Sequence, residues 1–150
     1  NQCWEYMFVF CKGKPKTFNP IKRKNLLTQI KKKSSTRNPD GSMDDMKYEM
    51  NKEESIEFNV WKYDVGYMKS AKDDIAFQHP AIFPEQLAKD HIVSWTNEGD
   101  IVLDIFGGSG TTGKMAEVTK RKWMLCELSD KYCEIANKRI EAERAQLKLF

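Results

Sequence analysis

The pattern of hydrophobic positions in the second half of the chain predicts three helices that alternate with two strands. Apolar residues recur at helical spacing over Pro84–Thr96, which predicts an amphipathic helix. The short apolar runs at Ile101–Leu103 and Lys122–Glu127 predict buried strands, and Thr112–Thr119 predicts a short helix between them. Ser129 is a good N-cap and begins a long final helix. This order is typical of a parallel α/β sheet.

The first half of the chain gives more varied signals. Trp4–Phe10 is aromatic and almost uninterrupted, so we expect a fully buried strand there. Phe58–Tyr63 alternates apolar and polar residues, which predicts a short, half-buried strand. Lys31–Asp45 is polar and charged, as in an exposed insertion, and Asn38–Gly41 predicts a turn within it. Ile21–Ile30 fits either a helix or a strand.

Composition limits the classes of protein that fit. A chain of 150 residues is expected to form one domain, and its 31% charged residues predict a highly charged surface. No run approaches the roughly 20 apolar residues that span a membrane. Four cysteines without a CxxC pair, and two histidines, do not predict a metal site, and we expect a reduced cytoplasmic protein. Because the chain starts at Asn1, without Met and in a strand-like run, we expect a fragment of a longer protein.

Charge is distributed unevenly along the first half. Asn1–Arg37 carries ten Lys or Arg and one acid, a net charge of +9, whereas Asn38–Phe58 carries two Lys and seven acids, a net charge of −5. A basic block suits a polyanion such as nucleic acid. A solvated surface segment explains it equally well, and charge alone does not separate the two.

A loop of small residues lies between the first predicted strand of the second half and the helix that follows it. Gly108–Gly113 matches G-x-G-x-x-G, with a strand before and a helix after it, the setting in which a helix N-terminus holds a nucleotide-like cofactor. Glu127 ends the next predicted strand, 19 residues after Gly108, where an acid accepts hydrogen bonds from a ribose. The alternative for Glu127 is a helix-capping surface acid. We favour the ribose role, because the strand, the glycine loop, the helix and the spacing to Glu127 all fit a cofactor site.

Nicotinamide dinucleotides and S-adenosylmethionine both suit this loop, and the spacing does not separate them. Two details favour the methyl donor. Asp104, at the end of the strand, places a carboxylate near the amino group of an amino-acid-bearing cofactor, and Ser109, Thr111 and Thr112 offer hydroxyls to its carboxylate. The alternative for Asp104 is a structural role as a brace of the loop.

Three segments resemble the amino-methylating DNA methyltransferases, specifically the class whose target-recognition region precedes the cofactor loop. They read HPAIFPEQLAKDHIVSW, GDIVLDIFGGSGTTG and WMLCELSDKYCEIANKRI, in the order and spacing of the family. The motif D-x-F-x-G-S-G-T-T is far more specific than the glycine pattern alone. The likeness extends more loosely to WEYMFVFCKGKPKTFNPI and FNVWKY.

The resemblance implies a Rossmann-like, S-adenosylmethionine-dependent methyltransferase fold of the α/β class, incomplete in this chain and with an inserted target-recognition segment. Residues 1–15 would be a sheet strand of the catalytic half, 16–57 the recognition segment and 58–150 the cofactor-binding region. The residues then expected to bind S-adenosylmethionine are Asp104, Phe106, Gly107, Gly108, Ser109, Gly110, Thr111, Thr112, Glu127, His79, Ala81 and Phe83. Among them, Glu127 would bind the ribose, and the segment from His79 to Phe83 would cover the methionine part.

The resemblance also implies double-stranded DNA as the partner, with the target base flipped into the pocket. Candidate phosphate contacts in the recognition segment are Lys31, Lys32, Lys33 and Arg37. The implied reaction is direct in-line attack of an exocyclic base amine on the methyl group of S-adenosylmethionine, with adenine N6 preferred over cytosine N4. The expected location is the cytoplasm of a prokaryotic or phage-infected cell. A homodimer and a partner restriction endonuclease stay open.

One departure from the family is large. Its catalytic tetrapeptide has the form D/N/S-P-P-aromatic, in which the polar residue and a carbonyl hold the target amine and the aromatic ring stacks on the flipped base. The five prolines of this chain include no Pro-Pro pair. In the class it resembles, the motif precedes all these segments. We therefore expect no catalytic residue in the chain, no activity of the chain alone, and Trp4–Phe10 left as a sheet edge. The alternatives are a remnant that binds DNA or cofactor without turnover and a nicotinamide-dependent dehydrogenase.

Overall fold

The computed structural model describes residues 4–25, 30–32, 37–43, 48–50 and 53–147. The chain divides into two compact units. The first unit comprises Asn1–Asn19 and Trp61–Phe150, and the second comprises Pro20–Val60. Among the described residues, every helix is too short or too polar to span a lipid bilayer.

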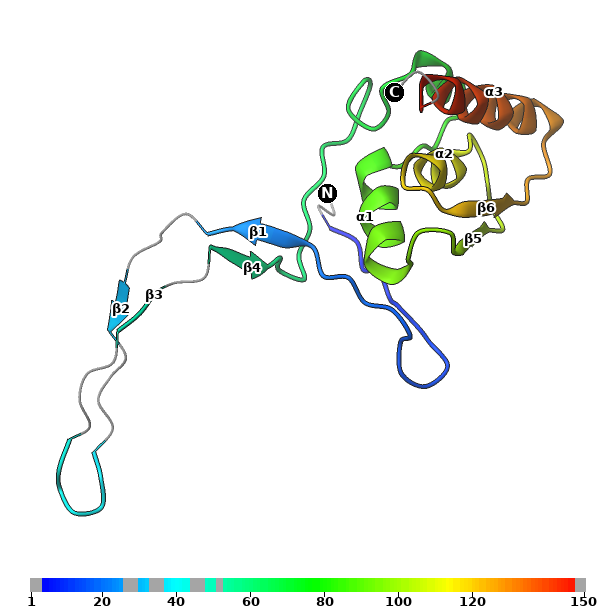
Figure 1. The fold of residues 1–150 in the computed structure, drawn as a ribbon. Helices are drawn as coiled ribbons and strands as arrows, with labels where there is room; N and C mark the ends of the chain where they lie inside the picture. Colours follow the sequence, from blue (N-terminus) through cyan, green and yellow to red (C-terminus); the bar gives the residue numbers. More distant parts are fainter. Residues whose placement is uncertain (1–3, 26–29, 33–36, 44–47, 51–52, 148–150) are drawn as a thin grey trace. The chain divides into compact units, whose positions relative to one another are not determined.

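The first unit contains the predicted alternation of helices and strands (Figure 1). Its elements are η1 (Asp74–Gln78), α1 (Glu85–Trp95), β5 (Ile101–Asp104), α2 (Thr111–Val118), β6 (Lys122–Leu125) and α3 (Asp130–Leu147). Strands β5 and β6 are parallel, in a register that pairs Ile101 with Lys122 and Asp104 with Leu125. Helix α2 joins them and packs against both strands, α1 and α3. The predicted α/β class is confirmed, with two parallel strands of a Rossmann-like sheet among the described residues.

The core of the first unit lies between α1 and α2. Ala88 and Ile92, four residues apart on one face of α1, are buried against Met115 and Ala116 of α2. On the opposite side α2 lies close to α3 and β6, because a Cβ added at Gly113 would lie 2.8 Å from Ile140 Cδ1 and 2.9 Å from a methyl of Leu125. Helix α2 thus packs against α1, α3 and β6. These contacts hold its N-terminus, and with it the loop between β5 and α2, in place.

The predicted buried strand at Trp4–Phe10 is wrong. The segment is not in a strand, and its large side chains are exposed, from 50% for Val9 to 88% for Phe10. The rings of alternate residues, from Trp4 to Phe10, follow one another with centroids 4.5, 6.0 and 6.2 Å apart. An apolar run is buried in a sheet only when neighbouring strands cover it. In the described residues no strand pairs with this segment.

The chain around Asn19 belongs with α1. The backbone N–H of Asn19 donates to the carbonyl of Ser94 (2.8 Å), and its Nδ2 donates to the carbonyls of Val93 (3.0 Å) and Thr96 (3.1 Å). These bonds satisfy acceptors that the end of a helix leaves open. The boundary between the units lies after Asn19, so the second unit begins four residues after position 16, where the sequence predicts the start of a recognition segment.

The second unit is an antiparallel ribbon. Its strands are β1 (Lys22–Lys24), β2 (Ile30–Lys32), β3 (Tyr48–Met50) and β4 (Glu54–Ile56), with β1 paired to β4 and β2 paired to β3. The open choice for Ile21–Ile30 is therefore decided as strand at Lys22–Lys24 and at Ile30, and residues 26–29 lie outside the described residues. The turn predicted at Asn38–Gly41 is confirmed, because the N–H of Gly41 donates to the carbonyl of Asn38 (3.0 Å) and Gly41 has a φ of +87°. The strand predicted at Phe58–Tyr63 is wrong, and Phe58 and Val60 are exposed.

Pairing in the ribbon sets the basic part of the sequence opposite the acidic part. Lys24 lies opposite Glu54, and Lys31 lies opposite Glu49. The Nζ of Lys22 lies 3.3 Å from a carboxylate oxygen of Glu54. Exposed pairs of this kind contribute only about 0–1 kcal/mol to stability. The pairing nevertheless places basic and acidic positions, which are far apart in the sequence, opposite one another in the strands.

Candidate functional site

The site begins where β5 ends. Asp104 closes β5 and accepts two hydrogen bonds from the loop that follows, one from the N–H of Phe106 (2.9 Å) and one from the hydroxyl of Thr112 (2.6 Å). The two carboxylate oxygens are used separately, one at each end of the loop. Asp104 therefore braces the turn from β5 into α2, which is the structural alternative that the sequence left open.

Two glycines shape the loop. Gly110 has a φ of +79°, and a Cβ added there would lie 2.7 Å from the Cβ of Ala136 and 2.8 Å from its Cα. The loop thus rests directly on α3, which only glycine permits. Gly108 has a φ of +50°, and a Cβ there would lie 3.3 Å from Nε2 of His79. The absence of a side chain at Gly108 thus lets the ring of His79 approach the backbone of the loop.

Glu127 follows β6 and faces the same loop. One carboxylate oxygen accepts from the N–H of Gly108 (2.8 Å) and the other from the N–H of Ser129 (2.9 Å). These two backbone bonds, that of Ser129 foremost, hold the pKa of Glu127 below its ordinary value, so the side chain is anionic at neutral pH. A carboxylate has about four acceptor positions. After these two bonds it retains the capacity to accept from two further hydroxyls.

The segment between η1 and α1 supplies the opposite wall. His79 accepts the N–H of Ala81 at Nδ1 (3.2 Å), and its ring packs on Tyr132 with centroids 4.4 Å apart. Because Nδ1 acts as an acceptor, a neutral His79 carries its proton on Nε2, the nitrogen near Gly108. The wall thus presents an N–H donor toward the loop.

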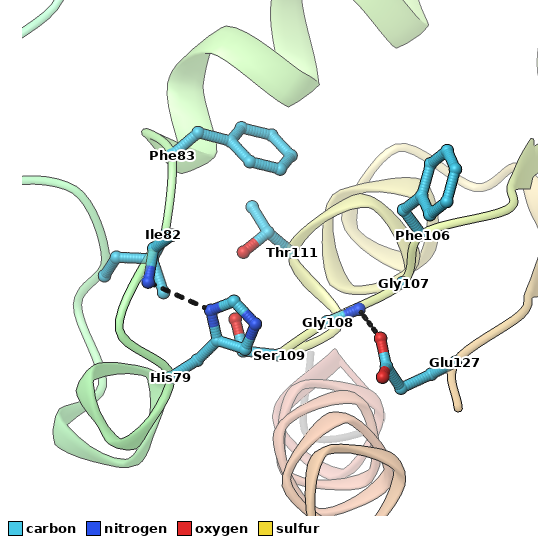
Figure 2. A pocket seen from close by; sticks show the side chains of 10 residues that line it. His79, Ile82, Phe83, Phe106, Gly107, Gly108, Ser109, Thr111 and Glu127 are labelled. Atoms are coloured by element: carbon cyan, nitrogen blue, oxygen red, sulfur yellow. Dashed lines mark hydrogen bonds between the residues drawn. The ribbon is translucent and has the colours of Figure 1, made fainter. Parts of the chain in front are cut away.

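The wall formed by His79–Phe83, the glycine loop and Glu127 line a cavity of about 250 Å³. This volume is several times the roughly 30 Å³ that a water molecule occupies. Figure 2 shows His79, Ile82 and Phe83 on one side and Phe106, Thr111 and Glu127 on the other. Of the twelve residues predicted to bind the cofactor, nine line this cavity: His79, Ala81, Phe83, Phe106, Gly107, Gly108, Ser109, Thr111 and Glu127. Asp104, Gly110 and Thr112 do not line it. Ile82 also lines the cavity and was not predicted. Its position between Ala81 and Phe83, which were both predicted, would have indicated it.

The candidate DNA contacts lie in the second unit. Lys31 and Lys32 belong to β2, and Lys33 lies outside the described residues. Arg37 is exposed and forms an antiparallel bridge with Met43 beside the turn. Their role stays a prediction.

The sequence missed a cluster of charged side chains packed beside the loop. Its centre is formed by Asp73, Glu85, Lys114 and Arg139, of which Arg139 is 2% exposed, and Glu143 lies at its edge, 3.8 Å from Lys114 Nζ. Burial alone would raise the pKa of Asp73, but its bonds to Lys114 and the charge of Arg139 lower it below the ordinary value. Burial alone would lower the pKa of Lys114, but its bonds to Asp73 and Glu85 raise it. Asp73 and Lys114 are therefore charged at neutral pH.

We expect the cluster to make stability depend on pH at both extremes. The folded pKa of Asp73 lies below its unfolded value of about 3.9, so its contribution is present above that value and is lost as the pH falls through the folded pKa. The folded pKa of Lys114 lies above about 10.4, so its contribution is present below that value and is lost as the pH rises through the folded pKa. Thermal unfolding followed by circular dichroism checks this. In Asp73→Asn the fall of Tm in acid should be smaller than in the original chain, and an equal fall would contradict the assignment.

The first unit combines a parallel α/β arrangement, a braced glycine loop and an acid after the second strand. These features are typical of a domain that binds a nucleoside-containing cofactor. The chain matches a family model described as DNA methylase, of the N6/N4 methyltransferase type, over residues 1–138. The chain belongs to this family, and the resemblance implied by its motifs is confirmed. The glycine pattern left open whether the cofactor is S-adenosylmethionine or a nicotinamide dinucleotide. S-adenosylmethionine is the cofactor of the family, so membership of the family favours it.

The chain is similar to individual methyltransferases over parts of its length. The chain is 53% identical over 144 residues to the orphan methyltransferase M.BamHII of Bacillus amyloliquefaciens, a match that covers 93% of the chain and 54% of the relative. It is 37% identical over 84 residues to the DNA adenine methyltransferase YhdJ of Escherichia coli, covering 55% of the chain and 27% of the relative. A solved structure, the cytosine-N4-specific PvuII DNA methyltransferase, aligns with a TM-score of 0.40 and 31% identity, covering 59% of the chain and 34% of that structure. The chain thus spans about half the length of M.BamHII and less of the others.

Proposed function

We propose that the chain is the cofactor-binding part of a DNA methyltransferase that transfers a methyl group from S-adenosylmethionine to an exocyclic base amine. The observation that carries the proposal is the cavity between the wall and the loop, in which Glu127 lies beside Gly108. Family membership supports the reaction class. The proposal covers the whole protein's activity, because the chain itself spans only part of its relatives.

The residues of the cavity fit this cofactor. Glu127 would accept hydrogen bonds from the ribose hydroxyls, using the acceptor capacity that its two backbone bonds leave. Ser109 and Thr111 accept from Arg139 and keep their own hydroxyl protons for the carboxylate of the cofactor. Thr112 differs, because its hydroxyl donates to Asp104. Of the three hydroxyls expected from the sequence, two are therefore suited to this role.

Bound S-adenosylmethionine supplies an electrophilic methyl group, and this chain's part is to hold and orient it. Phe83 and Phe106 are exposed at the cavity and offer apolar surface next to the polar loop. A Pro-Pro motif that would hold the acceptor amine does not occur in the sequence. The amine would accordingly be presented by other parts of the whole protein.

Double-stranded DNA is the proposed partner, with the second unit as the target-recognition segment. We prefer adenine N6 as the target over cytosine N4, and the family includes both. A remnant that binds cofactor or DNA without turnover is the non-catalytic alternative. The homodimer, the partner restriction endonuclease and the cytoplasmic location stay predictions of the resemblance.

The reaction can be tested on the full-length protein whose gene encodes this chain. The protein is incubated with duplex DNA and S-adenosylmethionine carrying a tritiated methyl group, and the DNA is digested to nucleosides and separated. We expect labelled N6-methyladenine, and no label in a parallel reaction with the 150-residue chain alone. Labelled N4-methylcytosine would select the alternative base. Absence of label with the full-length protein would support the remnant, and transfer by the chain alone would contradict its assignment as a cofactor-binding part.

A further inference from the structure

Four charged side chains from four different places in the sequence meet next to the cofactor loop. Asp73 is the N-cap of η1, Glu85 is the first residue of α1, Lys114 lies in α2 and Arg139 lies in α3. Their side chains are 29%, 11%, 8% and 0% exposed, respectively. The proposed function uses Arg139 only as a donor to the hydroxyls of Ser109 and Thr111 and assigns no role to the other three, and none of the four lines the cavity.

The four side chains form a closed ring of ion pairs. Asp73 accepts from Arg139 Nε at one carboxylate oxygen (2.8 Å) and from Lys114 Nζ at the other (2.6 Å). Glu85 Oε1 accepts from both cations, from an Nη of Arg139 (2.8 Å) and from Lys114 Nζ (2.8 Å). Each of these two carboxylates therefore bridges the same two cations, and Lys114 Nζ also lies 3.8 Å from a carboxylate oxygen of Glu143.

The ring holds both ends of the cavity wall. Asp73 directly precedes residues 74–84, which include His79 and Phe83, and Glu85 directly follows them. Both acids bind Lys114 of α2 and Arg139 of α3. The two ends of the segment between these acids are therefore fixed to the same two helices.

The remaining Nη of Arg139 binds the opposite side of the cavity. It donates to the carbonyl of Ser109 (2.6 Å) and lies within hydrogen-bonding distance of the hydroxyls of Ser109 (3.1 Å) and Thr111 (3.2 Å). One buried guanidinium thus joins the wall, through the two acids, to the glycine loop. A planar guanidinium has five donors in a fixed fork, whereas an ammonium group is a compact point charge and cannot span these acceptors.

We propose that Arg139 is a positioning residue for cofactor binding, which fixes the spacing between the His79–Phe83 wall and the Ser109–Thr111 loop. The inference rests on the proposed function, since it assumes that the cavity takes S-adenosylmethionine. Burying four charges costs desolvation free energy, so such a ring adds little net stability. Its effect is on geometry, because small displacements of binding groups reduce affinity strongly.

The test is the Arg139→Lys variant of the 150-residue chain, with Arg144→Gln as the matched control. Arg144 lies on the same helix and pairs with Glu117, outside the cavity. The dissociation constant for S-adenosylhomocysteine is measured by calorimetry well below the Tm of each variant, so that a loss of stability alone does not change it. Hydrogen exchange of the amides of residues 108–111 is measured without ligand. We expect Arg139→Lys to bind about tenfold more weakly and to exchange faster in this loop, and Arg144→Gln to match the original chain in both.

Each outcome decides the inference. Unchanged affinity and unchanged exchange in folded Arg139→Lys would overturn it. If that variant does not fold, Asp73→Asn takes its place, since it keeps the shape of the side chain and lies farther from the core; about threefold weaker binding supports the inference and equal binding overturns it. If the original chain itself binds no S-adenosylhomocysteine, the proposed function fails, and the exchange of the loop amides alone then decides whether Arg139 positions the loop.

Discussion

Replacing Gly110 with alanine is expected to lower the free energy of unfolding by about 3 kcal/mol and to abolish cofactor binding. Two costs combine. The φ of +79° at Gly110 costs an L residue about 1–2 kcal/mol, and the added Cβ would lie 2.7 Å from Ala136 Cβ, where overpacking costs about 1–3 kcal/mol. The neighbouring atoms belong to the backbone and Cβ of α3, so they have no rotamer by which to move away. Urea unfolding and calorimetric titration with S-adenosylhomocysteine measure the two effects.

Gly99→Ala is the matched control for this prediction. Gly99 lies in the same unit and has a φ of +86°, but nothing lies within 4 Å of a Cβ added there. Only the conformational cost of about 1–2 kcal/mol applies to it, and the cavity is not involved. If the two variants lost the same stability, the close packing of the loop on α3 would be contradicted.

Glu127→Gln is expected to weaken binding of S-adenosylhomocysteine by roughly 10- to 100-fold. Hydrogen bonds to a charged acceptor are worth about 1.5–3 kcal/mol, which corresponds to this range. The amide keeps the size of the side chain but removes the negative charge and places a donor where the N–H of Gly108 or Ser129 needs an acceptor. The dissociation constants of the variant and the original chain are compared by calorimetry.

Glu134→Gln serves as the control for the change of charge. Glu134 is exposed on α3 and does not line the cavity, so its replacement should leave the affinity unchanged. Equal affinities for Glu127→Gln and the original chain would show that Glu127 does not contact the ligand.

The sequence predicted most of the first unit because its signals there are local. Helical periodicity located α1, the short apolar runs located β5 and β6, and the glycine pattern located the loop before α2. The same locality explains the failure at Trp4–Phe10. An apolar run predicts burial, but burial depends on neighbouring strands that the run itself does not specify.

The site was predicted in part for similar reasons. The residues that line the cavity sit in short segments with specific patterns, so nine of the ten lining residues are among those that the sequence predicted. The role of Asp104 could not be decided, because spacing alone does not distinguish a ligand from a brace, and its two bonds to the loop favour the brace. The ring around Arg139 gave no signal. Its members lie up to 66 residues apart in the sequence, and a charged residue in a charged helix predicts a solvated face.

The charge asymmetry of the first half could also not be interpreted from the sequence alone. Sequence treats Lys24 and Glu54 as members of separate charged segments, whereas antiparallel pairing makes them neighbours. Net charge along a chain therefore does not give the net charge of a surface until the pairing is known. The role of the second unit in DNA recognition consequently rests on the family and on the proposal above, and not on this charge.

Calorimetric titration of the 150-residue chain with S-adenosylhomocysteine, beside an identical titration with NADH, distinguishes a methyl-donor site from a dinucleotide site. We expect binding of S-adenosylhomocysteine with a dissociation constant in the micromolar range or tighter and no binding of NADH, because the cavity combines Glu127, the glycine loop and the hydroxyls of Ser109 and Thr111. Binding of NADH without binding of S-adenosylhomocysteine would contradict this expectation.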